Sequence, residues 1–218
     1  DELGYEDVPV ITITSNDGYA SIGQYSLDLV RTAWRAVLCQ DILMKALLKT
    51  RPYEREKGAT DALYLESLED VGRAVSAMGV SHKQRLTGIV AAMTRARDRF
   101  RALPADYDRS RPLIGVVGEI FCRHNTFSNF DLIRLVEEQG GECWLAGIGE
   151  WVWYVDDEQR RRLAEEGRTF SRENAVRYVK TRIQRADERA IHGPWHEDFV
   201  GYEDVASVRD VLDLSKPY

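Results

Sequence analysis

The sequence predicts a helix-rich α/β fold with a small parallel sheet in a Rossmann-like three-layer arrangement. Two observations support this prediction. Apolar residues recur with helical spacing over most of the 218 residues. Between residues 113 and 146 the pattern changes to strand, helix and strand with short connections, which favours parallel strands and a right-handed crossover. We expect residues 1–110 and 111–218 to form one compact unit.

The first half, 1–110, is predicted to be a short strand followed by long helices. The β-branched run at 8–14 indicates the strand, and a turn follows it. Helical spacing over 26–49, with Ser26 as the N-cap, predicts the first helix, and a proline soon afterwards ends it. Two more helices are expected at 68–78 and 81–103, where a glycine and a proline end them.

The second half, 111–218, opens with the β-α-β unit. Its strands are expected at 113–118 and 142–146, with the first strand buried. A helix over 129–139, ended by two glycines, connects them. Two helices are then predicted over 157–191, divided near Gly167 and with Ser171 opening the second. A last amphipathic helix is expected at 203–214.

Charge and composition exclude several partners. The formal net charge is −6, which argues against nucleic acid, because that affinity comes from neutralising phosphates. No apolar run approaches the roughly 18 residues of a membrane span, so no membrane partner is expected. The acidic first residues carry no leader pattern, and three scattered cysteines suit a reducing cytoplasm. The absence of an initiator Met predicts a piece excised from a longer protein.

The most polar loop follows the first strand of the β-α-β unit. In parallel sheets, ligands bind just beyond the carboxyl ends of the strands. The loop is neither GxGxxG nor a P-loop, and its carboxylate disfavours a phosphate. It therefore supplies candidate ligand-binding residues for another ligand, unless Ser128 or Asn129 simply caps a helix. These candidates are Glu119, Arg123, His124, Asn125 and Asn129.

A second pair of candidates lies at the end of the first long helix. Arg51 and Tyr53 flank the proline that stops it. A guanidinium is a natural clamp for phosphate or carboxylate, so either residue could stand on the rim of the pocket. The alternative is a plain helix stop, with the arginine at the negative end of the helix dipole.

No metal centre is predicted for this chain. Iron–sulfur clusters need cysteines in a tight spatial set, and no CxxC occurs. Cys122 and Cys143 fall at opposite ends of parallel strands, roughly 20 Å apart, and Cys39 lies within an apolar helix. His192 and His196 are four residues apart, but the intervening Gly-Pro prevents a helix that would align them.

Four ordered segments carry a family resemblance. They are Trp34-Arg35-Ala36 with Asp41-Ile42-Leu43, Arg51-Pro52-Tyr53-Glu54 with Gly58, Gly115–Ile120 followed by Arg123, Asn125, Phe127 and Asn129, and Gly140-Gly141-Glu142 with Glu150-Trp151. On these residues the chain resembles the 2-hydroxyglutaryl-CoA dehydratase D-component family. More narrowly, it is similar to the acyl-CoA dehydratase activase-related (CoA-substrate-specific enzyme activase) proteins. It departs from them in having Thr126 where members tend to have proline.

The resemblance implies a place in ATP-driven, oxygen-sensitive dehydration of 2-hydroxyacyl-CoA compounds. The chain would be a segment that shapes the pocket or docks a partner rather than catalysing alone. Its partners would be other regions of the parent protein, an activase or a dehydratase-like component, with acyl-CoA as a candidate ligand. An iron–sulfur cluster would belong to the full-length protein, through a cysteine expected just beyond Tyr218.

Two alternatives stay open. The chain could be a stand-alone Rossmann-like domain that binds a small molecule at the loop after its first strand. It could also be a structural interaction module, which would expose an apolar patch of several hundred Å² instead of forming a pocket.

Overall fold

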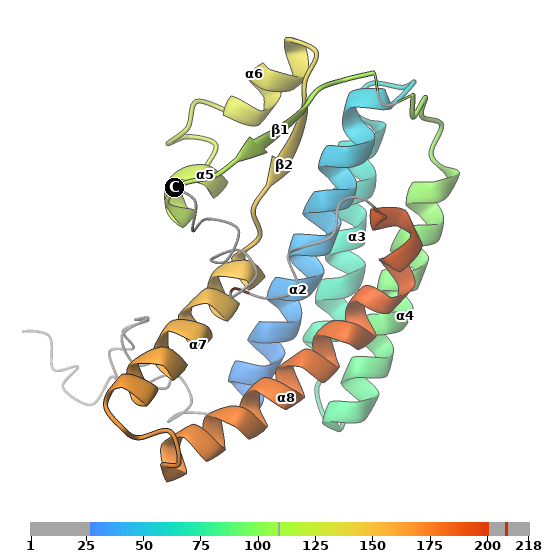
Figure 1. The fold of residues 1–218 in the computed structure, drawn as a ribbon. Helices are drawn as coiled ribbons and strands as arrows, with labels where there is room; N and C mark the ends of the chain where they lie inside the picture. Colours follow the sequence, from blue (N-terminus) through green and yellow to red (C-terminus); the bar gives the residue numbers. More distant parts are fainter. Residues whose placement is uncertain (1–26, 109, 201–207, 209–218) are drawn as a thin grey trace, which may run out of the picture.

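The computed structural model describes residues 27–108, 110–200 and 208, arranged as shown in Figure 1. The long helices are α2 (Leu27–Thr50), α3 (Ala59–Val75), α4 (His82–Ala102), α7 (Ile148–Glu165) and α8 (Arg172–His192). The shorter elements are η1 (Arg51–Tyr53), β1 (Leu113–Val116), α5 (Ile120–His124), α6 (Leu132–Glu138), β2 (Glu142–Leu145) and η2 (Gly193–Phe199). This part of the chain is therefore helix-rich α/β with a small parallel sheet. The predicted strand 8–14 and nearly all of the predicted helix 203–214 lie outside the described residues.

Helix α2 is central, because α3, α4, α7, α8 and β2 all contact it (Figure 1). The apolar spacing that predicted this helix places Trp34, Leu38 and Ile42 on the face that points to the core. Each of these side chains is at most 5% exposed. Burying side chains of this size contributes about 1.5–3 kcal/mol each. The predicted helix is confirmed, and its predicted cap, Ser26, lies outside the described residues.

Helices α3 and α4 contact each other and α2. Helix α3 starts at Ala59 rather than at the predicted residue 68, directly after Gly58 with φ 89°. Helix α4 matches its prediction closely, because Ser81 and Gln84 form a reciprocal capping box at its start. The apolar stripe of α4 is buried, with Met93 and Ile89 fully inaccessible to solvent.

A buried ion cluster joins α2 to α8. Asp187 of α8 is 1% exposed and accepts two hydrogen bonds from Arg35 and two from Arg31, all of 2.9–3.0 Å. Arg35 is completely buried. Burial by itself raises the pKa of Asp187, but the bonds from the two guanidiniums outweigh it and hold this pKa below the ordinary value.

The two strands pair in parallel, as predicted, with Leu113 opposite Glu142 and Val116 opposite Leu145. Successive residues of a strand face opposite sides. On one side of β2, the Cys143 thiol lies 3.9 Å from the Ile133 carbonyl of α6. On the other side, the Lys45 ammonium of α2 lies 4.7 Å from the centre of the Trp144 ring. Both helices pack on β2, because Leu48 of α2 and Ile133 of α6 belong to one apolar cluster with Cys143.

The prediction of a buried first strand is wrong. Only Val116 of β1 is buried, and the strand ends there rather than at residue 118. Because β1 pairs with β2 alone among the described residues, its other edge has no neighbouring strand. The connecting helix is also shorter than the predicted 129–139. Phe130 and Asp131 have φ of 54° and 53°, so a helix cannot begin until Leu132.

Helices α7 and α8 are divided near Gly167, which has φ 70°, and Ser171 caps α8 through the Asn174 amide, as predicted. Helix α7 begins at Ile148 rather than residue 157, so Trp151 and Trp153 belong to it. The predicted break at Gly193-Pro194 forms a 3₁₀ helix, in which the buried Trp195 stacks on Phe199.

Candidate functional site

The predicted loop begins where β1 ends and turns at once into helix α5. Gly118 adopts φ 125°, a conformation that favours glycine. Glu119 is the N-cap of α5, and its carboxylate accepts a hydrogen bond of 2.9 Å from the Cys122 amide. Hydrogen bonds from the amides of Cys122 and Phe121 lower the pKa of Glu119. This carboxylate is therefore ionised at neutral pH and engaged with its own helix.

Arg123 ties the carboxyl ends of the two strands together. Its guanidinium donates to the carbonyl of Gly118 after β1, at 2.9 Å, and to the carbonyl of Gly147 after β2, at 3.3 Å. Both partners are main-chain oxygens, and the side chain is half-buried. The sequence prediction correctly placed Arg123 at this edge of the sheet, where its visible role is to brace the two loops.

His124 lies beside a buried carboxylate that the sequence prediction of the site left out. Asp41 of α2 accepts hydrogen bonds from the amides of Ile148 and Gly149, at 3.1 and 2.7 Å, and so occupies the N-terminus of α7. Burial raises the pKa of Asp41, although the two amides oppose this shift. Burial and then the Arg123 charge lower the pKa of His124, which makes its imidazole neutral at pH 7.

The close approach of Asp41 requires glycine in the loop after β2. A Cβ on Gly147 would stand 2.8 Å from an Asp41 carboxylate oxygen, and one on Gly149 would stand 3.1 Å from it. The sequence signal for Asp41 was an acid between Leu38 and Leu48, on a helix face where Lys45 is the next charged residue. A buried carboxylate needs a hydrogen-bond donor, but the sequence does not indicate that the first amides of α7 supply it.

Asn125 and Asn129 shape the loop between α5 and α6. The Asn125 side-chain oxygen accepts from the Ser128 amide at 3.0 Å. The Asn129 side-chain nitrogen donates to the carbonyls of Cys122 and Arg123, at 3.0 and 3.1 Å, and its oxygen accepts from the Leu132 amide. The prediction that Asn129 starts the helix is off by three residues, because this side chain closes α5 as well as leading into α6.

Arg51 and Tyr53 lie at the opposite, amino edge of the strand pair. Arg51 makes two bonds of 2.8 Å to Glu137 of α6 and one of 3.0 Å to Asp61 of α3. The Tyr53 hydroxyl donates to Glu142, the first residue of β2, at 2.8 Å. Burial, followed by this bond, raises the pKa of Tyr53 to about 12. The structure therefore does not bring these two residues to the loop at 119–129.

Apolar side chains on the same loop point into solvent. Four of them are between 63% and 90% exposed, and we call them the apolar loop residues: Val117, Phe121, Phe127 and Phe130. Leu132 and Leu135 of α6 add exposed apolar surface beside them. The left-handed conformation of Phe130 is strained, and such strain is typical of functional positions. The site residues predicted from the sequence are the polar ones of this loop and do not include these four.

The three cysteines differ in their burial. Burial raises the pKa of Cys39 to about 12 and that of Cys143 to about 11, whereas Cys122 is exposed. Within the described ranges, no group of three or more His, Cys, Asp or Glu side chains is arranged to hold a metal ion. Over the same ranges, no helix combines the length and the apolar character that crossing a bilayer requires.

Comparisons with known proteins add no relative to this description. A scan against protein-family models, a search of curated proteins and a search of solved structures each gave no match.

Proposed function

We propose that this chain is a docking segment of a protein related to the 2-hydroxyacyl-CoA dehydratases and their activases, and that it does not catalyse alone. The proposed family relationship rests on the four ordered segments that resemble it. The proposed docking role rests on the loop at 117–131. In this proposal, the loop binds the dehydratase-like component of the same system.

One observation supports docking most directly. Glu119, Arg123, Asn125 and Asn129 bind the loop itself or neighbouring main chain, and Nε of Arg123 and Nε2 of His124 are buried without a partner among the described residues, whereas the apolar loop residues are exposed. A ligand site for a polar molecule would present free donors and keep its aromatic rings as walls. Exposed aromatic rings on a braced backbone are instead typical of the central contacts of a protein interface.

The small-molecule alternative has weaker support. The loop does lie at the carboxyl edge of parallel strands, where ligands bind in open sheets. However, the N-terminus of α7, which could receive an anionic group of acyl-CoA, already holds the Asp41 carboxylate. Docking therefore explains more of the observed contacts than acyl-CoA binding does.

The proposal has three further parts. A Rossmann-like arrangement would have three layers, formed by α6, the two paired strands and α2. The protein would act in the cytoplasm, where its three cysteines stay reduced. Any iron–sulfur cluster would be held by the longer protein or its partner rather than by the residues of this segment.

A binding titration tests the docking role. Purified activase and purified dehydratase-like component from the same cells are passed separately over the immobilised chain. We expect the dehydratase-like component to bind, and Phe127→Ser/Phe130→Ser to weaken this binding at least about 30-fold. Two anchoring aromatic residues together contribute about 2 kcal/mol or more.

The matched control is Phe170→Ser, because Phe170 is fully exposed in the turn before α8. This variant should bind like the parent chain. Unchanged binding by the double variant, with an intact circular dichroism spectrum, would contradict the docking role. Calorimetry with acyl-CoA tests the small-molecule alternative. If the loop binds acyl-CoA, Arg123→Ala and Asn125→Ala should each lower the affinity for acyl-CoA roughly tenfold.

A further inference from the structure

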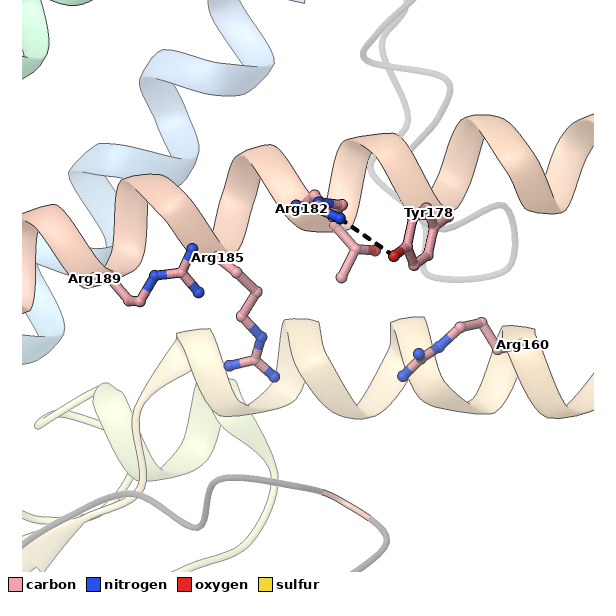
Figure 2. Close-up of a pocket in the computed structure, with 6 residues that line it drawn as sticks. Arg160, Tyr178, Arg182, Arg185 and Arg189 are labelled. Atoms are coloured by element: carbon pink, nitrogen blue, oxygen red, sulfur yellow. Dashed lines mark hydrogen bonds between the residues drawn. The ribbon is translucent and has the colours of Figure 1, made fainter.

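A groove between α7 and α8 gathers arginine side chains. It has a volume of about 310 Å³ and is lined by Arg160 of α7 and by Tyr178, Thr181, Arg182, Arg185 and Arg189 of α8. Figure 2 shows Arg185 extending from α8 to α7, Arg189 lying along α8 and Arg160 lying along α7. None of the described residues that line it carries a carboxylate. This groove shares no residue with the loop at 117–131.

The charge of α8 is opposite to that of the whole chain. Residues 172–192 contain six Lys or Arg and three Asp or Glu, a net charge of +3, in a chain of net charge −6. One of the three acids, Asp187, is buried against Arg31 and Arg35 and does not face the groove. The positive charge is therefore concentrated on the solvent side of this helix.

Two of the four guanidiniums already have carboxylate partners, and two do not. Arg160 pairs with Asp157 at 3.1 Å, and Arg185 pairs with Glu188 at 3.0 Å. Arg182 contacts the Tyr178 hydroxyl at 3.4 Å. Within the part of the chain that the structure describes, neither Arg182 nor Arg189 has a carboxylate partner. A concave surface with two such cations favours an added anion.

Arg185 is held in place by an aromatic ring. Its guanidinium lies 3.6 Å from the centre of the Trp153 ring, within the range of cation–π contact. Trp153 is itself fixed, because its indole nitrogen donates to Glu188 and its ring packs edge-on against Trp34. A guanidinium fixed in this way loses less entropy when it binds an anion than a freely moving one does.

We propose that this groove binds a small molecule through a phosphate or diphosphate group, held by Arg182, Arg185 and Arg189. Planar guanidiniums match phosphate oxygens in bidentate geometry, and the hydroxyl of Tyr178 adds a neutral donor. The Thr181 hydroxyl already donates to Asp156 and lines the groove without adding a donor. A volume of about 310 Å³ is at the lower end of ligand pockets, so it suits a phosphorylated small molecule. This inference does not depend on the docking role.

Calorimetric titration of the whole chain with inorganic pyrophosphate tests the proposal. We expect one site, and at least a tenfold loss of affinity in Arg182→Gln/Arg189→Gln, because each charged hydrogen bond lost weakens binding several-fold or more. The matched control, Arg73→Gln/Arg99→Gln, removes the same charge from exposed positions on α3 and α4 and should stay within twofold of the parent chain. Sulfate is expected to bind more weakly than pyrophosphate.

Three results would overturn the proposal: no pyrophosphate binding at millimolar concentration, equal losses in the two double variants, or equal affinity for sulfate. If the groove variant fails to fold, Arg182→Lys/Arg189→Lys keeps the charge and removes the planar fork, and it should lose affinity several-fold. Tryptophan fluorescence gives an independent readout. Pyrophosphate should change the emission of the parent chain, and Arg182→Gln/Arg189→Gln should shift this change to higher pyrophosphate concentration by the same factor as in calorimetry.

Discussion

Replacing Asp187 by asparagine removes the carboxylate that, among the described residues, compensates Arg35 in the core. Asp187 is 1% exposed and Arg35 is fully buried, whereas the Arg31 side chain is 32% exposed and can turn to water. The substitution therefore leaves one buried, uncompensated charge, which costs about 3–5 kcal/mol. For a chain of this length we expect the midpoint of thermal unfolding to fall by roughly 6–20 °C.

Urea unfolding followed by circular dichroism at pH 7 measures this loss, with Asp70→Asn as the control. Asp70 pairs with Arg95 and Arg73 on the surface, so its neutralisation should cost no more than about 1 kcal/mol. Because the folded-state pKa of Asp187 is lowered, the advantage of the parent chain should be complete above about pH 4 and disappear as the pH falls through the folded pKa. A loss at pH 7 no larger than that of Asp70→Asn would refute the reasoning.

Three further predictions concern local geometry. Gly147→Ala should destabilise the fold by about 1–3 kcal/mol in the same urea assay, since its Cβ would stand 2.8 Å from the Asp41 carboxylate; a neutral result would contradict that crowding. Ellman's reagent at pH 8 should modify Cys122 alone in the folded chain, because Cys39 and Cys143 are buried; rapid reaction of a second thiol would count against this. Ser81→Ala should cost about 1 kcal/mol by removing the capping box of α4, and unchanged stability would show that the cap is dispensable.

Local signals in the sequence located most of the helices. The apolar spacing of α2, the Ser81 cap of α4 and the glycine between α7 and α8 each act within a few residues, so they are visible in a single sequence. The start of α7 was missed because the aromatic run around Trp151 resembles a strand end as much as a helix. The break before α6 was missed because Phe130 and Asp131 both adopt left-handed backbone conformations, and neither is a glycine that would have indicated this in the sequence.

The candidate site was harder to predict because its contacts cross long sequence distances. Arg123 and His124 were placed correctly at the strand ends by the β-α-β pattern. Their partner Asp41 lies on α2, more than 100 residues from the amides that it binds in α7, and no spacing rule connects the two. The same applies to Arg51, whose bond to Glu137 depends on how α6 packs rather than on its own helix end.

The position of α2 has a consequence for the order in which the chain matures. Helix α2 leaves the ribosome before α8, because Asp187, which neutralises Arg31 and Arg35, lies 156 and 152 residues after them. Until α8 has been synthesised, these two guanidiniums and part of the apolar face of α2 have no lasting cover. The nascent chain thus carries an unfinished core while the residues between α2 and α8 are translated, and a chaperone that recognises basic, apolar helices would meet it during that interval.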